Sequence, residues 1–168
     1  MNMNSKGFTL VETVTATGLS TMILICLMTL LISSIYGWSK GVSRNTAMET
    51  ATMASQRLSN DMRDGMSASV YSGVLTVLFP GTVTDSSNGE TVYDLASSAT
   101  TSRSYLVTNK VLVRRENGSD TVIARNITSA SFSIQGQSVV TSIQSLDNSG
   151  SYSSSALVNG KVLLRNYR

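Results

Sequence analysis

The sequence predicts an α+β fold, in which one long N-terminal helix packs on a small antiparallel β-sheet domain. Three observations lead to this prediction. Residues 13–39 carry no charged side chain, and an apolar stripe with helical spacing then continues as far as Met62. Beyond Gly65, apolar and polar residues alternate in short segments bounded by turn residues. A chain of 168 residues has room for a membrane segment and one small domain.

The charge-free run has the length of a membrane-spanning helix. At about 1.5 Å per residue, residues 13–39 extend roughly 40 Å, which exceeds the ~30 Å hydrocarbon core of a bilayer. Tyr36 and Trp38 stand at its far end, where amphipathic rings favour the membrane interface. A removed secretory signal peptide is the alternative, but its apolar region is usually only about 7–15 residues long. No small-residue cleavage site follows the run, so we favour an anchor that stays on the chain.

The helical pattern continues past the apolar run as an amphipathic extension. Its apolar residues recur at steps of three or four, which places them on one helical face. They are Ala47, Ala51, Ala54, Leu58 and Met62. We expect one helix from about Phe8 to Asp64, stopped by Gly65, with a weak Arg57–Asp61 pair on its polar side. The extension, residues 40–66, is expected to lay this stripe on the sheet.

Residues 67–168 are expected to form the β-rich domain. The strands expected from alternation are 74–79, 91–95, 103–108, 110–115, 121–124, 130–135, 139–145 and 162–165. The turns expected between them are Pro80-Gly81, Asn88-Gly89, Asn117-Gly118, Asn148-Ser149-Gly150 and Asn159-Gly160. The clearest hairpin joins 110–115 to 121–124 through residues 116–120. About 100 residues of serine-rich sheet form a thin core, so the helix stripe should complete it.

The composition argues against an enzyme. The sequence has no His, which excludes His-based acid–base chemistry, a Ser-His triad and His-ligated metal. Its single Cys, Cys26, cannot form an internal disulfide or a thiolate zinc cluster. Neither a nucleophile-elbow motif nor a phosphate-binding glycine loop occurs. An anchored hydrolase would lack a nucleophile–base pair, so we expect a non-enzymatic protein with no cofactor.

Two binding functions have weak signals. A basic patch for nucleic acid could form from Arg103, Lys110, Arg114, Arg115 and Arg125. Adjacent strand residues point to opposite faces, however, few aromatics interleave, and the net charge is only +3. Residues 85–90 and 147–151 faintly resemble calcium loops but lack their acidic density. A solvated sheet surface and ordinary turns are favoured, and binding of DNA or calcium is left open.

The N-terminal heptapeptide Lys6-Gly7-Phe8-Thr9-Leu10-Val11-Glu12 carries the main functional signal. Glu12 stands at the head of an apolar helix, where burial of an unpaired carboxylate costs about 2.5 kcal/mol or more. Either Glu12 stays hydrated at the membrane surface, or it has a cationic partner. The heptapeptide as a whole resembles the prepilin signature of the type IV pilin and type II secretion pseudopilin family.

The resemblance implies a processing step and an assembly contact. A membrane-embedded prepilin peptidase would remove residues 1–7 as a leader, cutting after Gly7, and would N-methylate Phe8. Glu12 then becomes the fifth residue of the mature chain. Its carboxylate would pair with the new α-amine of Phe8 on a neighbouring subunit. Residues 8–39 would form the transmembrane and filament-core helix of a pilin-like fold.

The remainder of the chain narrows the resemblance within the family. Residues 111–115 with 123–132, and residues 160–166, are similar to J-type pseudopilins and W-type minor pilins. Major pilins often have Pro where Thr29 stands and often close a C-terminal loop with a disulfide, which a chain whose single Cys is Cys26 cannot do. These departures favour a minor pilin or pseudopilin, with the filament tip as one expected position.

The resemblance also implies partners and a location. The expected partners are the prepilin peptidase, the inner membrane before assembly, and other pilins or pseudopilins in a filament. Lys6 on the leader favours a cytoplasmic N-terminus and an extracytoplasmic domain. Motility pili, competence pili and type II secretion pseudopili are not distinguished. The rival interpretation is a single-pass, membrane-anchored binding or adhesion module unrelated to pili.

Overall fold

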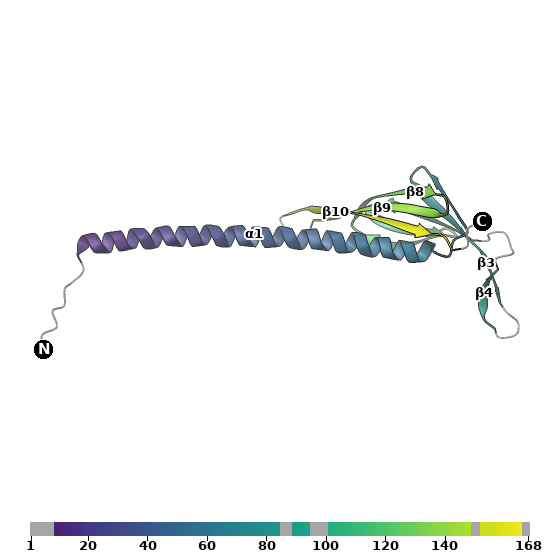
Figure 1. The fold of residues 1–168 in the computed structure, drawn as a ribbon, viewed down its shortest axis with the longest axis horizontal. Helices are drawn as coiled ribbons and strands as arrows, with labels where there is room; N and C mark the ends of the chain where they lie inside the picture. The colour runs from purple at the N-terminus through teal and green to yellow at the C-terminus, as the bar shows by residue number, and fades with distance from the viewer. Residues whose placement is uncertain (1–8, 85–88, 95–100, 149–151, 166–168) are drawn as a thin grey trace. The chain divides into compact units, whose positions relative to one another are not determined.

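The structure, a computed structural model, describes residues 9–84, 89–94, 101–148 and 152–165. It confirms the α+β class, because one long N-terminal helix packs against antiparallel sheets (Figure 1). The chain divides into two compact units, residues 1–41 and residues 42–168. Helix α1, Leu10–Met62, contributes its first part to one unit and its last part to the other.

In the first unit, α1 is a solitary apolar helix. Its described residues from Leu10 onward are almost all exposed, including Leu30 at 67% and Trp38 at 74%. Several threonines lie within it, and their hydroxyls donate to carbonyls three or four residues back, as Thr21 does to Thr17 at 2.7 Å. These bonds satisfy the hydroxyls without water. The helix is long and apolar enough to span a membrane.

The second unit packs the last part of α1 against antiparallel strands. A five-stranded sheet has the order β1-β2-β5-β6-β7, and a three-stranded sheet has the order β10-β9-β8. Strands β3 and β4 pair only with each other among the described residues. The strands are β1 Ser67–Tyr71, β2 Val74–Phe79, β3 Gly81–Thr84, β4 Thr91–Asp94, β5 Thr101–Thr108, β6 Val111–Glu116, β7 Ser119–Arg125, β8 Ile127–Gln135, β9 Ser138–Asp147 and β10 Ser154–Leu163.

The core lies between α1 and the two larger sheets. The stripe residues Ala47, Ala51, Ala54, Leu58 and Met62 are all buried, none more than 1% exposed. They share the core with Leu75, Val77, Tyr105 and Leu112 of the five-stranded sheet and with Ile127, Val139, Ile143 and Val162 of the three-stranded sheet. The three alanines let the helix approach the strands closely, and burial of each large side chain stabilises the fold by about 1.5–3 kcal/mol.

The helix ends slightly earlier than expected. It ends at Met62 rather than Asp64, and the Gly65 N–H then donates to the Met62 carbonyl at 2.9 Å. Strand β1 begins only two residues beyond Gly65 and was not expected, because its sequence Ser-Ala-Ser-Val-Tyr has little apolar alternation. It forms because the β2 edge pairs with it residue for residue, from Ser67 opposite Leu78 to Tyr71 opposite Val74.

Two of the expected turns are strand segments. Gly81 begins β3 instead of completing a turn with Pro80, and Asn159-Gly160 lies inside β10. A Cβ at position 160 would lie 2.7 Å from the Ser55 hydroxyl oxygen and 2.9 Å from that of Thr141, so the close approach of helix and strands favours glycine there. Gly160 therefore marks a contact and not a chain reversal. Parts of the expected turns at 88–89 and 148–150 lie outside the described residues.

The expected hairpin forms with a tighter turn than predicted. Strands β6 and β7 extend to Glu116 and Ser119, which pair with each other. The turn consists of Asn117 and Gly118 alone, with φ angles of 51° and 80°. Positive φ at both central residues is the geometry of the hairpin turns that favour Asn-Gly.

Candidate functional site

The first candidate site is the head of α1, where Glu12 is held by Thr9, the residue that precedes the helix. The Thr9 N–H and the Thr9 hydroxyl each donate to Glu12 Oε2 at 3.3 Å. The Glu12 N–H in turn donates to Thr9 Oγ1 at 3.3 Å. This reciprocal pair is a capping box, with Thr9 as the N-cap and Glu12 three positions later. The cap fixes the carboxylate over the first turn, where the helix dipole favours negative charge.

The capping box gives Glu12 a role that the sequence analysis overlooked. The signal was present in the sequence as Thr-x-x-Glu directly before an apolar run. Because the bonds are long, the cap holds Glu12 weakly, and both Thr9 and Glu12 remain exposed. Gly7 and Phe8, the residues expected to be cut and methylated, lie outside the described residues.

The helix offers Glu12 no cation nearby. From Thr9 to Ser39 there is no Lys or Arg, and the first basic residue along the helix is Lys40. At about 1.5 Å per residue, Lys40 lies roughly 40 Å along the helix from Glu12. A cationic partner for this carboxylate must therefore come from residues that precede the helix or from another molecule.

The second candidate site is a polar cluster where the end of α1 meets the five-stranded sheet. Asp61 Oδ1 accepts from Arg114 Nη1 at 2.9 Å and from Arg103 Nη1 at 3.2 Å. Asp61 Oδ2 accepts from the Tyr105 hydroxyl at 3.1 Å. The Asp61 side chain is only 17% exposed, and those of Arg103 and Arg114 are each 27% exposed. One carboxylate therefore joins the helix to two neighbouring strands.

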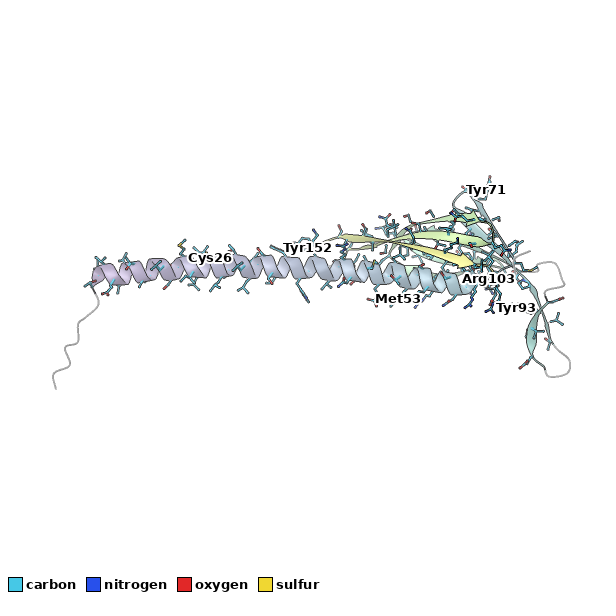
Figure 2. All side chains as sticks on the ribbon, in the orientation of Figure 1. Cys26, Met53, Tyr71, Tyr93, Arg103 and Tyr152 are labelled. Atoms are coloured by element: carbon cyan, nitrogen blue, oxygen red, sulfur yellow. The ribbon has the colours of Figure 1, made fainter. Side chains whose placement is uncertain are left out.

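Glu116 completes the charge balance of this cluster. Its Oε2 lies 3.1 Å from Arg103 Nε and 3.8 Å from Arg114 Nε, so the cluster has two carboxylates for two guanidinium groups. The Arg103 guanidinium also stacks over the Phe79 ring, 4.3 Å from its centroid. Figure 2 shows Arg103 near the end of the helix. Balanced charge and shared hydrogen bonds make this cluster a structural junction.

The surroundings shift the pKa of two cluster members. Burial, followed by the negative charge and hydrogen bond of Asp61, raises the pKa of Tyr105 well above its usual value, so the phenol stays protonated. Burial opposes the charge of Arg103, but the adjacent Glu116 and Asp61 carboxylates outweigh it and raise the pKa of Arg103. Neither group is poised for proton transfer near neutral pH.

The basic residues considered for nucleic acid are mostly engaged within the chain. Arg103 and Arg114 bind Asp61, while Arg115 forms an exposed bidentate pair with Asp120 at 2.7 and 2.9 Å. That pair lowers the pKa of Asp120, chiefly through the hydrogen bond from Arg115. The expected Arg57–Asp61 pair is wrong, because Arg57 donates to the Ile123 carbonyl at 3.0 Å instead.

Metal binding finds no support in the part of the chain that the structure describes. Among those residues, no group of three His, Cys, Asp or Glu side chains could hold a metal ion. Most of the calcium-like segment at 85–90, and part of the one at 147–151, lies outside the described residues. Cys26 is an exposed, free thiol on the apolar helix, as Figure 2 shows.

Comparison of the chain with protein-family models, curated proteins and solved structures gave no match. The functional interpretation therefore depends on the residues and their geometry.

Proposed function

We propose that this protein is a non-enzymatic minor pilin or pseudopilin, processed by a prepilin peptidase and assembled into a type IV pilus-like or type II secretion filament. The support comes from the seven residues Lys6–Glu12 in their context. They resemble the prepilin signature, they lead into a helix that can span a membrane, and that helix continues into an α+β domain. In this proposal the domain is extracytoplasmic and the N-terminus starts in the cytoplasm.

The observation that carries the proposal is an acidic side chain with no cation within reach on its own helix. Glu12 precedes a charge-free run, and no basic residue occurs between Thr9 and Ser39. Cleavage after Gly7 would create an α-amine at Phe8, which is largely cationic at neutral pH because such amines have a pKa of about 7.7–8.0. In an apolar filament core, pairing that amine with Glu12 of a neighbour is strongly favoured over leaving either charge alone.

The capping box offers a second explanation of Glu12, as a residue that only stabilises the start of the helix. A test of the assembly role must therefore separate the charge of Glu12 from its capping contact. Glu12→Gln keeps an amide oxygen that accepts the Thr9 N–H bond but removes the charge. Thr9→Ala removes the cap hydroxyl, at a cost of about 1 kcal/mol to the helix end, but keeps the charge. We expect Glu12→Gln to reduce incorporation into filaments as severely as Glu12→Ala, and Thr9→Ala to reduce it much less.

Filament incorporation of tagged variants in the native host is the measurement, with membrane levels of each variant as the control. If Glu12→Gln is incorporated like the wild type, Glu12 acts only as a helix cap and the assembly pair is wrong. A membrane-anchored binding or adhesion module becomes the better interpretation if the wild type itself is not incorporated, because the Thr-x-x-Glu cap then explains Glu12 without a filament.

Cleavage is tested separately by co-expression with a prepilin peptidase in a host that lacks one. We expect the wild type to lose residues 1–7 and Gly7→Val to stay uncut, because a branched side chain replaces the glycine at the proposed scissile bond. Mass spectrometry of the purified chains reads out both results. An uncut wild type beside a control prepilin that is cut would contradict the proposed processing.

A further inference from the structure

A second feature of the domain has no role in the N-terminal proposal. Strands β3 and β4 form a separate two-stranded ribbon, the β3–β4 arm, defined by residues 81–84 and 89–94. Figure 1 shows the arm projecting away from the two larger sheets. Val83 and Val92 are register partners on one face, and they are 49% and 50% exposed. Tyr93, on the other face, is 49% exposed. An isolated ribbon is only marginally stable in water, so a surface that covers these side chains would stabilise it.

A groove of matching character lies at the other end of the domain. It runs between α1 and the first residues of β10 and is lined by Arg44, Asn45, Met48, Ser155, Ala156 and Leu157. Met48 and Leu157 are 52% and 59% exposed, which gives the groove apolar walls. Strand β10 is the edge of its sheet and pairs only with β9 among the described residues, so its outer edge can accept a further strand. We call this feature the α1–β10 groove.

The charges of the arm and the groove are opposite. The described residues of the arm carry Glu90 and Asp94 and no basic residue. The groove contains Arg44, and none of the residues that line it is acidic. Opposite charges around an apolar contact steer association and set its orientation. The arm is therefore complementary to the groove in both charge and apolar character.

The arm cannot fill the groove of its own chain, because they lie at opposite ends of the domain. The start of β10 lies beside the helix at Ser43, whose hydroxyl donates to the Tyr152 carbonyl at 3.4 Å. The arm leaves β2 beside the helix end, where the Met66 N–H donates to the Leu78 carbonyl at 2.7 Å. From position 45 to position 62, an α-helix rises about 25 Å.

We propose that the β3–β4 arm of one copy docks in the α1–β10 groove of a second copy, where it adds to the β10 edge. The contact joins two different surfaces, so a docked pair keeps one free groove on the first copy and one free arm on the second, and repetition gives an open chain of copies. This inference concerns the domain alone and does not rest on cleavage or on Glu12.

Site-specific cross-linking of the full chain in detergent tests this contact. In a Cys26→Ser background, one sample carries Val92→Cys on the arm and a second, distinguishable by an affinity tag, carries Leu157→Cys in the groove. Both positions are half exposed, so the substitutions disturb little packing. After mixing and mild oxidation, we expect mixed disulfide dimers several-fold above the statistical proportion. A chain carrying both cysteines should give a ladder of dimers, trimers and larger species.

The control pairs Leu157→Cys with Tyr71→Cys, because Tyr71 is 85% exposed and lies at the end of β1, outside the arm (Figure 2). Arg44→Glu and added salt should both lower the yield of mixed dimers. The proposal is overturned if Val92→Cys links to Leu157→Cys no better than Tyr71→Cys does. It is also overturned if symmetric Val92–Val92 or Leu157–Leu157 dimers predominate, or if the doubly substituted chain stops at dimers.

Discussion

Replacement of Asp61 by alanine tests how the long helix is fastened to the five-stranded sheet. Asp61 is the only residue of α1 with an ion pair to β5 and β6 among the described residues, and it accepts from Arg103, Arg114 and the Tyr105 hydroxyl. Asp61→Ala removes all three acceptor contacts at once. The two guanidinium groups then share Glu116 alone, and the Tyr105 hydroxyl, on a fully buried residue, loses its acceptor.

The expected cost follows from these contacts. Each hydrogen bond to a charged group contributes about 1.5–3 kcal/mol, and a buried donor left unsatisfied costs about 1–3 kcal/mol. Adding these contact energies overestimates the loss, because contacts that share one carboxylate are not additive. In addition, both arginines are 27% exposed and remain near Glu116. We expect Asp61→Ala to lower the free energy of unfolding by about 3 kcal/mol, or roughly 10 °C in Tm.

Chemical unfolding of the detergent-solubilised chain, followed by circular dichroism in the β-sheet region, is the assay. Tryptophan fluorescence is unsuitable, because the single tryptophan, Trp38, lies in the other unit. Asp120→Ala is the matched control, because it also removes an aspartate–arginine pair. The Arg115 and Asp120 side chains of that pair are 52% and 41% exposed, and such surface pairs contribute little to stability. If Asp61→Ala were no more destabilising than Asp120→Ala, the cluster would not fasten the helix.

Two further predictions concern the helix–sheet contact. Gly160→Ala should destabilise the domain by about 1–3 kcal/mol, since the new Cβ would lie 2.7 Å from the Ser55 hydroxyl oxygen, and Ser55→Ala in the same chain should restore part of the loss. Equal unfolding midpoints for Gly160→Ala and the wild type would contradict that close approach. Because the pKa of Tyr105 is raised in the folded chain, the stability that its phenol contributes is fully present below about pH 10, the usual pKa of tyrosine. That stability is lost as the pH rises above this value. Denaturant unfolding between pH 8 and 11 should therefore show a steeper alkaline loss for the wild type than for Tyr105→Phe, and parallel profiles would contradict this assignment.

Much of the fold could be predicted because its strongest signals are local. The charge-free run and the stripe from Ala47 to Met62 repeat at helical spacing, and both lie in α1. Strand β2 matches the expected residues 74–79, since Val-Leu-Thr-Val-Leu-Phe is bounded by a turn and a proline. Strands whose stability comes from their neighbours gave weaker signals. Strand β10 begins at Ser154, whereas alternation indicated only residues 162–165, because its polar half is ordered by pairing with β9.

The polar cluster could not be predicted from the sequence, because its members come from distant elements. Asp61 was expected to pair with Arg57, one turn away on the same helix, yet its partners lie on β5 and β6. Pairing of β5 with β6 places Tyr105 opposite Arg114 and Arg103 opposite Glu116, and that register becomes visible only once the sheet is assembled. The Thr9–Glu12 cap, by contrast, was readable locally from its spacing of three residues.

The central claim concerns the N-terminus, and the intact mass of the protein purified from its native host tests it most directly. We predict a chain that begins at Phe8, lacks residues 1–7 and carries one additional methyl group on its α-amine. A native chain that still begins at Met1 would contradict this account, because the α-amine proposed to pair with Glu12 would then never form.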